Sequence, residues 1–273
     1  MDLDGGPAGI TSMSTTHRSA RTALALTVLG MLASAFSPGR AAAQLGGEGF
    51  MFRQPTVSVA LHGGYALPTA RSDLFDQTFA DLRLDRHDFE SPYFGGELSI
   101  RASDQWDVSL EVGHSWSSTR TEWRDFVEDD GVGGEGRPIR QTVDFSRTPV
   151  TVSGKLYLTD RGRSIGRFVW IPARVTPFVG AGAGLIRYRF EQDGDFVDAG
   201  TLEIFMDRLE QVGTGFTAHG FAGVDVMLKK MLYLTTQARY AWAEGGLDRT
   251  IYEGFEPMDL SGFQLTLGLG IRF

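Results

Sequence analysis

The last thirteen residues, Ser261 to Phe273, read SGFQLTLGLGIRF and alternate between two kinds of side chain. One parity carries Phe263, Leu265, Leu267, Leu269, Ile271 and Phe273, and the other carries Gln264, Thr266, Gly268, Gly270 and Arg272. Because successive side chains of a strand point to opposite faces, this stretch predicts a strand with one apolar and one polar face. A soluble sandwich can also use such a strand, so the pattern alone does not show which face meets water.

The same alternation recurs along the chain and predicts seven further strands. Six of them alternate clearly and lie at residues 56–67, 93–102, 106–116, 150–158, 216–228 and 232–243. The seventh, at about 176–190, has similar residues on both parities, so its register stays open. Long polar connections at 68–91, 118–141, 191–213 and 244–260 alternate with short turns along the chain, and the seventeen-residue link 159–175 stands where a short turn would be expected. Long loops at one end and short turns at the other are typical of an antiparallel meander.

The N-terminus has the layout of a secretory signal peptide. Two arginines, Arg18 and Arg21, precede an apolar stretch from Thr22 to Phe36, and an Ala41-Ala42-Ala43 segment follows. Basic, apolar and small-residue regions in this order predict export and cleavage. We expect residues 1–43 to be the signal peptide, with Met13 as an alternative start, and residues 44–54 to form a short periplasmic segment.

The two faces of the predicted strands differ in charge. The apolar parity is nearly free of charge and has aromatic residues near strand ends, namely Tyr65, Trp106, Trp116, Tyr240, Trp242 and Phe273. Aromatic girdles on either side of an apolar band are typical of a barrel in a bilayer. Barrel closure also pairs every backbone group, which lipid cannot do. The sequence therefore predicts an all-β fold, an eight-stranded antiparallel up-and-down transmembrane β-barrel over residues 55–273.

The polar parity predicts a cluster of charges in the lumen. Its members are Glu97, Arg101, Asp107, Glu111, Lys155, Asp225 and Arg239. A turn at Ala102 to Gln105 would place Arg101 opposite Asp107 and Glu97 opposite Glu111. Two adjacent carboxylates need a cation, which Lys155 or Arg239 could supply. Such a cluster would plug the lumen, either as a purely structural network or as an ion gate.

The chain resembles the small eight-stranded outer-membrane β-barrels, the OmpA, OmpX and OmpW-like group, over about residues 55–273. The resemblance rests on TPFVGAGAGL at residues 176–185, on QARYAW at residues 237–242 and on the last strand. In that family a C-terminal aromatic residue is part of the signal read by the barrel-assembly machinery, and Phe273 matches it. The resemblance implies a location in the bacterial outer membrane and contact with its lipids.

Several functional classes are disfavoured. Cysteine is absent, so there is no thiolate metal site or cysteine nucleophile, and the net charge of −8 argues against a nucleic-acid partner. Ser115 follows His114 directly and would point to the opposite face, so we predict no enzyme activity. The acidic stretch from Asp193 departs from a calcium loop at Val197 and Asp198. We expect no cofactor and no metal.

The long connections carry 24 acidic and nine basic side chains. An acidic rim of this kind could bind an extracellular ligand or divalent cations, or could simply stay solvated. We expect a monomeric structural or surface-interaction protein. The alternative is a narrow pore or an OmpW-like route for small or hydrophobic molecules.

Overall fold

Eight strands close into a ring in the computed structural model, which describes residues 50–128, 136–198, 200–248 and 254–273. The ring strands are β1 (Val57–Pro68), β2 (Ser91–Arg101), β3 (Trp106–Glu128), β4 (Arg137–Tyr157), β7 (Val175–Val197), β8 (Ile204–Met227), β9 (Leu232–Gly245) and β11 (Gly262–Arg272). Neighbouring strands pair antiparallel, and β1 pairs with β11 from Ser58↔Arg272 to Pro68↔Gly262. The predicted eight-stranded antiparallel barrel is therefore confirmed, and its seam is closed by the C-terminal stretch. The predicted signal peptide, residues 1–43, lies outside the described residues.

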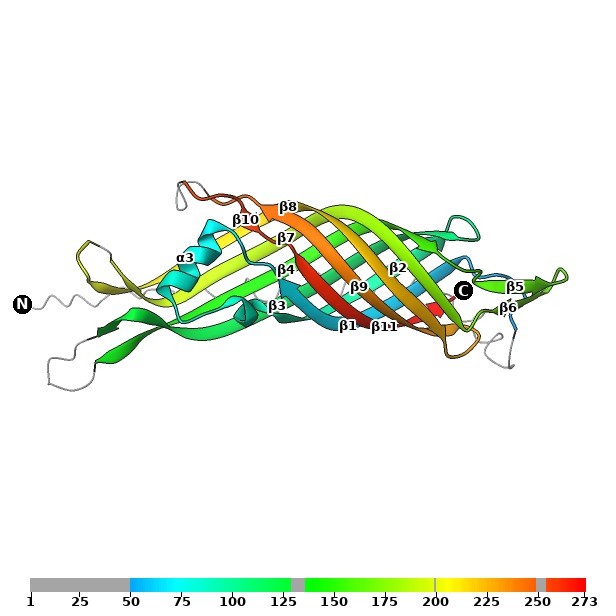
Figure 1. Ribbon diagram of the computed structural model, residues 1–273, viewed down its shortest axis with the longest axis horizontal. Coiled ribbons are helices and arrows are strands. Elements are labelled where there is room, and N and C mark those ends of the chain that lie inside the picture. The colour runs from blue at the N-terminus through cyan, green and yellow to red at the C-terminus, as the bar shows by residue number, and fades with distance from the viewer. Residues whose placement is uncertain (1–49, 129–135, 199, 249–253) are drawn as a thin grey trace, which may run out of the picture. The chain divides into compact units, whose positions relative to one another are not determined.

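Short elements occupy the connections. One end of the barrel carries the helix α3 (Asp73–Asp81), the 3₁₀ helix η2 (Arg86–Phe89) and the two-residue strand β10 (Met258–Asp259) (Figure 1). The other end carries the hairpin of β5 (Gly162–Ile165) and β6 (Val169–Pro172), with the C-terminus nearby. Met51, within the predicted segment 44–54, bridges to Trp170 of β6. No helix within the described ranges is long and apolar enough to cross a membrane.

Two of the expected loops are strands instead. The strands β3, β4, β7 and β8 are 23, 21, 23 and 24 residues long, so most of residues 118–141 and 191–213 continue the ladder. Crossing a bilayer takes only about 9–11 residues of strand. Two long hairpins, β3–β4 and β7–β8, therefore project beyond the remaining strands. The polar composition that indicated loops is that of strands in which most side chains are at least partly exposed and several of the buried ones, such as Thr121, Gln141 and Gln211, are also polar.

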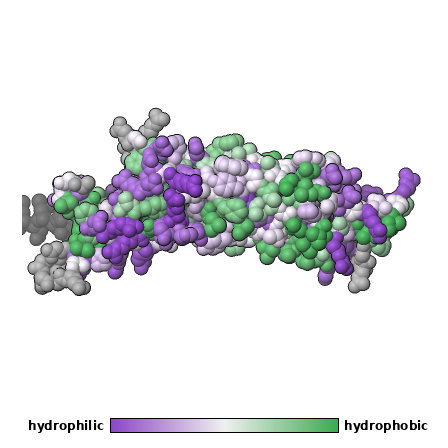
Figure 2. All heavy atoms as spheres, in the orientation of Figure 1, coloured by the Kyte–Doolittle hydropathy of each residue, from purple (hydrophilic) through white to green (hydrophobic). Residues whose placement is uncertain are grey.

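The outer face of the ring is apolar. Large hydrophobic side chains alternate outward with exposed fractions of about one third to two thirds, such as Leu61 at 65%, Phe216 at 64% and Leu267 at 53%. Figure 2 shows apolar surface over the barrel strands and hydrophilic surface over the end that carries α3 and the long hairpins. A continuous exposed apolar belt is unfavourable in water and is expected of a barrel surrounded by lipid.

The register left open at residues 176–190 is settled by burial. Thr176, Phe178 and Ile186 are buried, whereas Val179 and Leu185 are exposed, so the even-numbered side chains of β7 point inward. The glycines at 180, 182 and 184 share this inward parity. A Cβ added at Gly182 would lie 2.4 Å from Ser153 Oγ and 2.8 Å from the His219 ring. These three glycines therefore leave room in the lumen for larger side chains of the neighbouring strands, such as Phe221 and His219.

Candidate functional site

The barrel interior contains the charged side chains that the sequence pointed to. Arg101 pairs with Asp107 and Glu97 with Glu111 across β2 and β3, which is the register expected from the four-residue turn. Both glutamates are buried at 5% exposure. Their burial side by side requires that cations neutralise them, because an unpaired buried carboxylate is costly.

Glu111 has a cation of its own from across the ring. The Arg239 guanidinium on β9 contacts the Glu111 carboxylate, and the Tyr93 hydroxyl donates a hydrogen bond to it at 2.7 Å. The Arg239 guanidinium also lies 5.6 Å from the centre of the Phe221 ring. One of the two cations proposed from the sequence thus serves this glutamate.

Glu97 shares the other cation with a second carboxylate. Lys155 Nζ lies 4.0 Å from Glu97 and 3.7 Å from Asp225, and sits 3.8 Å from the centre of the Phe178 ring. Ser99 Oγ donates a hydrogen bond to Glu97 at 2.7 Å. Because Lys155 bridges Glu97 and Asp225, three strands of the ring are tied together through one ammonium group.

Two further arginines complete the network: Arg272, which the sequence placed on the lumen-facing parity, and Arg161, which the sequence did not indicate. Arg272 on the last strand lies 2.5 Å from Asp225, and Arg161 from the 159–175 link lies 2.7 Å from Asp107. Arg161 also donates to the backbone carbonyls of Ser103 and Asp104 at 2.7 and 2.9 Å. The signal for Arg272 was its inward parity, whereas the path of the link that brings Arg161 under the barrel leaves no local pattern.

Arg101 does not join the others. Its side chain is 23% exposed and its Nη1 lies 3.9 Å from Asp104 in the turn. Asp107, its cross-strand neighbour, is taken by Arg161. The expectation that Arg101 belongs to the buried cluster is therefore wrong, because this residue stands at the end of β2, where its side chain is partly exposed and its carboxylate neighbour is Asp104 of the turn. We call the remaining set the charged layer, which consists of Glu97, Asp107, Glu111, Lys155, Arg161, Asp225, Arg239 and Arg272.

The other half of the interior is apolar, which sequence reasoning did not reveal. Residues 69–90 fold over the barrel mouth and bury Phe75 and Phe89 against Phe145 of β4 and Phe190 of β7. The Phe75 ring meets those of Phe89, Phe145 and Phe190 edge-on, with ring centres 5.1, 5.7 and 5.8 Å apart. Phe79 packs against Phe75 at 6.3 Å. We call these five side chains the aromatic cap. The phenylalanines within the otherwise polar stretch 68–91 were the signal that could have indicated it.

The cap segment is attached to the β3–β4 hairpin by hydrogen bonds to and from its backbone. The Arg124 side chain on β3 donates to the carbonyl oxygens of Phe79, Leu82 and Leu84 at 2.9, 2.7 and 3.2 Å. The Arg83 N–H donates to the Glu122 carbonyl at 2.9 Å. A guanidinium at a helix C-terminus satisfies carbonyl groups that the helix leaves unpaired. The length of the hairpin is therefore part of what holds α3 over the lumen.

The aromatic side chains expected to form girdles lie on the outside of the barrel. Tyr65, Trp106, Trp116, Trp242 and Phe273 are 47%, 48%, 45%, 57% and 37% exposed, and Tyr240 is partly exposed. Trp106 and Phe273 lie at the end with the short turns, and the other four lie toward the long hairpins. Tyr240 and Trp242 pack edge-on at 4.9 Å. The two groups are thus separated along the barrel.

One contact between a serine and a histidine was not expected from the sequence. Ser153 Oγ on β4 and His219 Nε2 on β8 lie 2.9 Å apart, with both side chains buried in the lumen. The pair could not be found from nearness in sequence, the basis on which Ser115 was considered, because its two residues come from strands far apart in the chain. No described side chain bonds to His219 Nδ1, so the pair lacks the orienting group of a catalytic triad.

The acidic stretch from Asp193 continues strand β7 as far as Val197 and turns at Asp198. The Asp198 carboxylate accepts the N–H groups of Gly200 and Thr201, each at 2.8 Å. The N–H groups of Thr201 and Gly200 lower the pKa of this exposed carboxyl. Among the residues that the structure describes, no group of three or more His, Asp or Glu side chains is placed to hold a metal ion.

Comparisons with known proteins found similarity to solved structures. No protein-family model and no curated protein matches the chain. Similar solved structures include Neisserial surface protein A, with 12% identity, a TM-score of 0.46 and coverage of 80% of this chain and 96% of its own. OprG of Pseudomonas aeruginosa has 14% identity and a TM-score of 0.41, and the match covers 82% of this chain and 99% of OprG. E. coli outer membrane protein W has 16% identity and a TM-score of 0.39, and the match covers 81% of this chain and 100% of that protein.

By their names, these three proteins are a surface protein and two outer-membrane proteins. Because these TM-scores lie below 0.5, the barrel architecture of this chain is assigned from its own strand pairing.

Proposed function

We propose that this protein is an integral outer-membrane β-barrel with a structural or surface-interaction role, and that its lumen is closed. The observation that carries the proposal is the pairing of an exposed apolar belt outside with buried ion pairs inside. A soluble eight-stranded barrel would have the opposite arrangement. The belt would contact outer-membrane lipids, and the chain would be a monomer because closure leaves no strand edge in the ring unpaired.

The closed lumen is supported by two independent obstructions. Lys155, Arg239 and Arg272 cross the interior to reach carboxylates on other strands. Above them, the aromatic cap buries Phe75 and Phe190 completely, at 0% exposure. An ion crossing the barrel would have to displace both the ion pairs and the rings.

The surface role is assigned to the end with the long hairpins. The segment 191–213 carries seven acidic side chains and one basic one, and it also exposes Phe205 and Met206 at 45% and 80%. Projecting strands with exposed apolar and charged side chains are a common form of recognition surface. We place this end outside the cell, where an extracellular ligand could contact it. Phe273 would serve as the assembly signal at the opposite end.

Planar-bilayer recording on refolded protein tests the closed lumen. We expect no stable single-channel steps, with insertion verified by the heat-dependent gel mobility of folded protein in the same sample. Steady conductance steps from the wild-type protein would contradict the closed lumen and would favour the narrow-pore alternative. A variant with residues 72–89 replaced by a short glycine-serine turn is a useful comparison, because the charged layer alone should still block conductance.

A further inference from the structure

Among the described residues, Arg147 is the only buried cation of the barrel without a carboxylate within 4.0 Å. Its side chain on β4 is 7% exposed. The other buried cations, Lys155, Arg161, Arg239 and Arg272, each have a carboxylate within that distance. Arg147 donates one hydrogen bond, from Nη1 to the Leu260 carbonyl at 3.1 Å, and lies over the Phe145 ring at 5.3 Å. A neutral carbonyl and a ring face do not neutralise a full charge, and the nearby Asp259 carboxylate attracts the guanidinium without contacting it, so no anion of the protein is in direct contact with Arg147.

The acid near this end of the barrel is engaged elsewhere. Asp259 accepts hydrogen bonds from the Thr69 hydroxyl and from the N–H groups of Arg71 and Ser261. Glu111, the carboxylate of the adjacent part of the charged layer, is paired with Arg239. Neither carboxylate therefore lies within ion-pair distance of Arg147.

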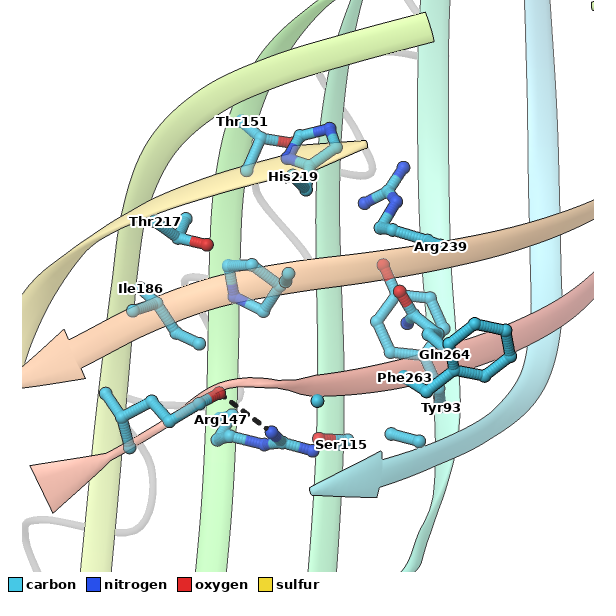
Figure 3. A pocket seen from close by; sticks show the side chains of 15 residues that line it. Tyr93, Ser115, Arg147, Thr151, Ile186, Thr217, His219, Arg239, Phe263 and Gln264 are labelled. Carbon is cyan, nitrogen blue, oxygen red and sulfur yellow. Dashed lines mark hydrogen bonds between the residues drawn. The ribbon is translucent and has the colours of Figure 1, made fainter. Parts of the chain in front are cut away.

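Arg147 lines a cavity between the charged layer and the aromatic cap. The cavity has a volume of about 50 Å³, and its polar lining includes Arg147, Arg239, His219, Ser115, Thr151 and Thr217. Figure 3 shows Arg147 on one side of it and His219 with Arg239 on the other. His219 is 3% exposed, and while its Nε2 contacts Ser153, its Nδ1 has no partner in the described structure. The lining therefore supplies one cation without a contacting carboxylate, Arg147, and an unpaired ring nitrogen, whereas Arg239 is already paired with Glu111.

We propose that this cavity binds a small monovalent anion of about the size of chloride. The Arg147 guanidinium would neutralise it, and the His219 Nδ1–H, in the tautomer whose Nε2 accepts from Ser153, would donate a hydrogen bond to a water that shares the cavity with the ion. A single water needs roughly 10–15 Å³ of such volume, so about 50 Å³ accommodates a small ion with a few waters and excludes a sugar or a lipid headgroup. The proposed site depends only on the barrel interior, so it stands or falls independently of the surface role.

Unfolding of the refolded protein in detergent, at constant ionic strength, provides the first test. Sodium chloride is compared with sodium gluconate, whose anion is too large for the cavity. We expect chloride to stabilise the wild-type protein in a saturable way, with the unfolding equilibrium constant falling about 100-fold at 100 times the dissociation constant. Arg147→Met should abolish the chloride effect, and Arg187→Met, which removes an exposed arginine from the outer face of β7, should leave it intact.

Bromide diffraction on the wild-type protein tests the site without any variant. Crystals grown in sodium bromide should show an anomalous peak within about 3.5 Å of the Arg147 guanidinium, the range of a charge-assisted contact to a halide. An ordered peak at that position would support the site even if Arg147→Met fails to fold. Water density without an anomalous signal, or equal stability of the wild-type protein in chloride and gluconate, would overturn the proposal.

Discussion

The charged layer and the aromatic cap fill the same barrel by opposite means. The charged layer consists of long side chains that reach across the ring from the strands, and every member has a partner of opposite charge. The cap consists of phenylalanine rings, three of them brought in by a connecting segment. The first arrangement is rigid because an unpaired buried charge is costly, and the second is stabilised by apolar burial that carries no such penalty. The two regions should therefore respond very differently to mutation.

The largest effect is expected at the Arg239–Glu111 pair. Arg239→Met leaves Glu111 buried without a cation and should lower the free energy of unfolding by about 3–5 kcal/mol. Urea titration of the refolded protein in detergent measures this change. The double variant Arg239→Met/Glu111→Gln should recover most of the loss, since no isolated charge remains. Equal losses in the single and double variants would show that the ion pair is not what holds this layer.

A similar truncation in the cap should have a smaller global effect. Phe75→Ala removes a ring that is 0% exposed, a change that costs about 3–5 kcal/mol in a conventional core. We expect Phe75→Ala to lower the free energy of unfolding by about 3 kcal/mol or less, because residues 69–90 can detach while the ring of strands persists. Hydrogen exchange should show faster exchange in α3 and unchanged protection in β1 and β11. Cooperative loss of protection throughout the barrel would contradict the separation of the two regions.

Loosening the attachment of the cap should have a smaller effect still. Arg124→Gln removes the guanidinium that donates to three carbonyl groups at the end of α3. The expected cost is about 1–3 kcal/mol, confined to the cap. Limited proteolysis between residues 69 and 90 reports it directly. Arg120→Gln, an exposed change on the same strand, is the matched control, and an equal increase in cleavage in both variants would argue against the anchoring role.

The smallest effect is expected from the His87–Glu90 pair at the base of the cap. The Glu90 carboxylate, which accepts a hydrogen bond from the His87 Nδ1–H at 2.6 Å, raises the pKa of His87 above its usual 6.5. Because the folded-state pKa is raised, the pair stabilises the cap fully below pH 6.5 and loses its contribution as the pH rises through the raised pKa. An NMR titration of His87 should show this midpoint, and Glu90→Gln should return it toward 6.5. An unchanged midpoint in Glu90→Gln would exclude the pair as the cause.

The charged layer was largely predictable because side-chain parity and a short turn can both be read from neighbouring residues in the sequence. The parity of Glu97, Glu111, Lys155 and Arg239, together with the turn at 102–105, was enough to place two carboxylates side by side and to name their cations. Arg161 was not predictable, since it reaches Asp107 from a link whose path depends on the closed ring. The Ser153–His219 contact was missed for the same reason, because it joins β4 and β8 across β7.

The sequence by itself determined the positions of eight strands, the faces of seven of them and the antiparallel order, because side-chain alternation with a period of two can be read residue by residue. It also determined that the final stretch from Phe263 to Phe273 has an apolar side for lipid and a polar side for the lumen. Only the tertiary structure decided that β3–β4 and β7–β8 continue as long hairpins and that residues 69–90 fold back over the mouth. These features depend on which surfaces meet after closure, and a linear pattern does not contain that information.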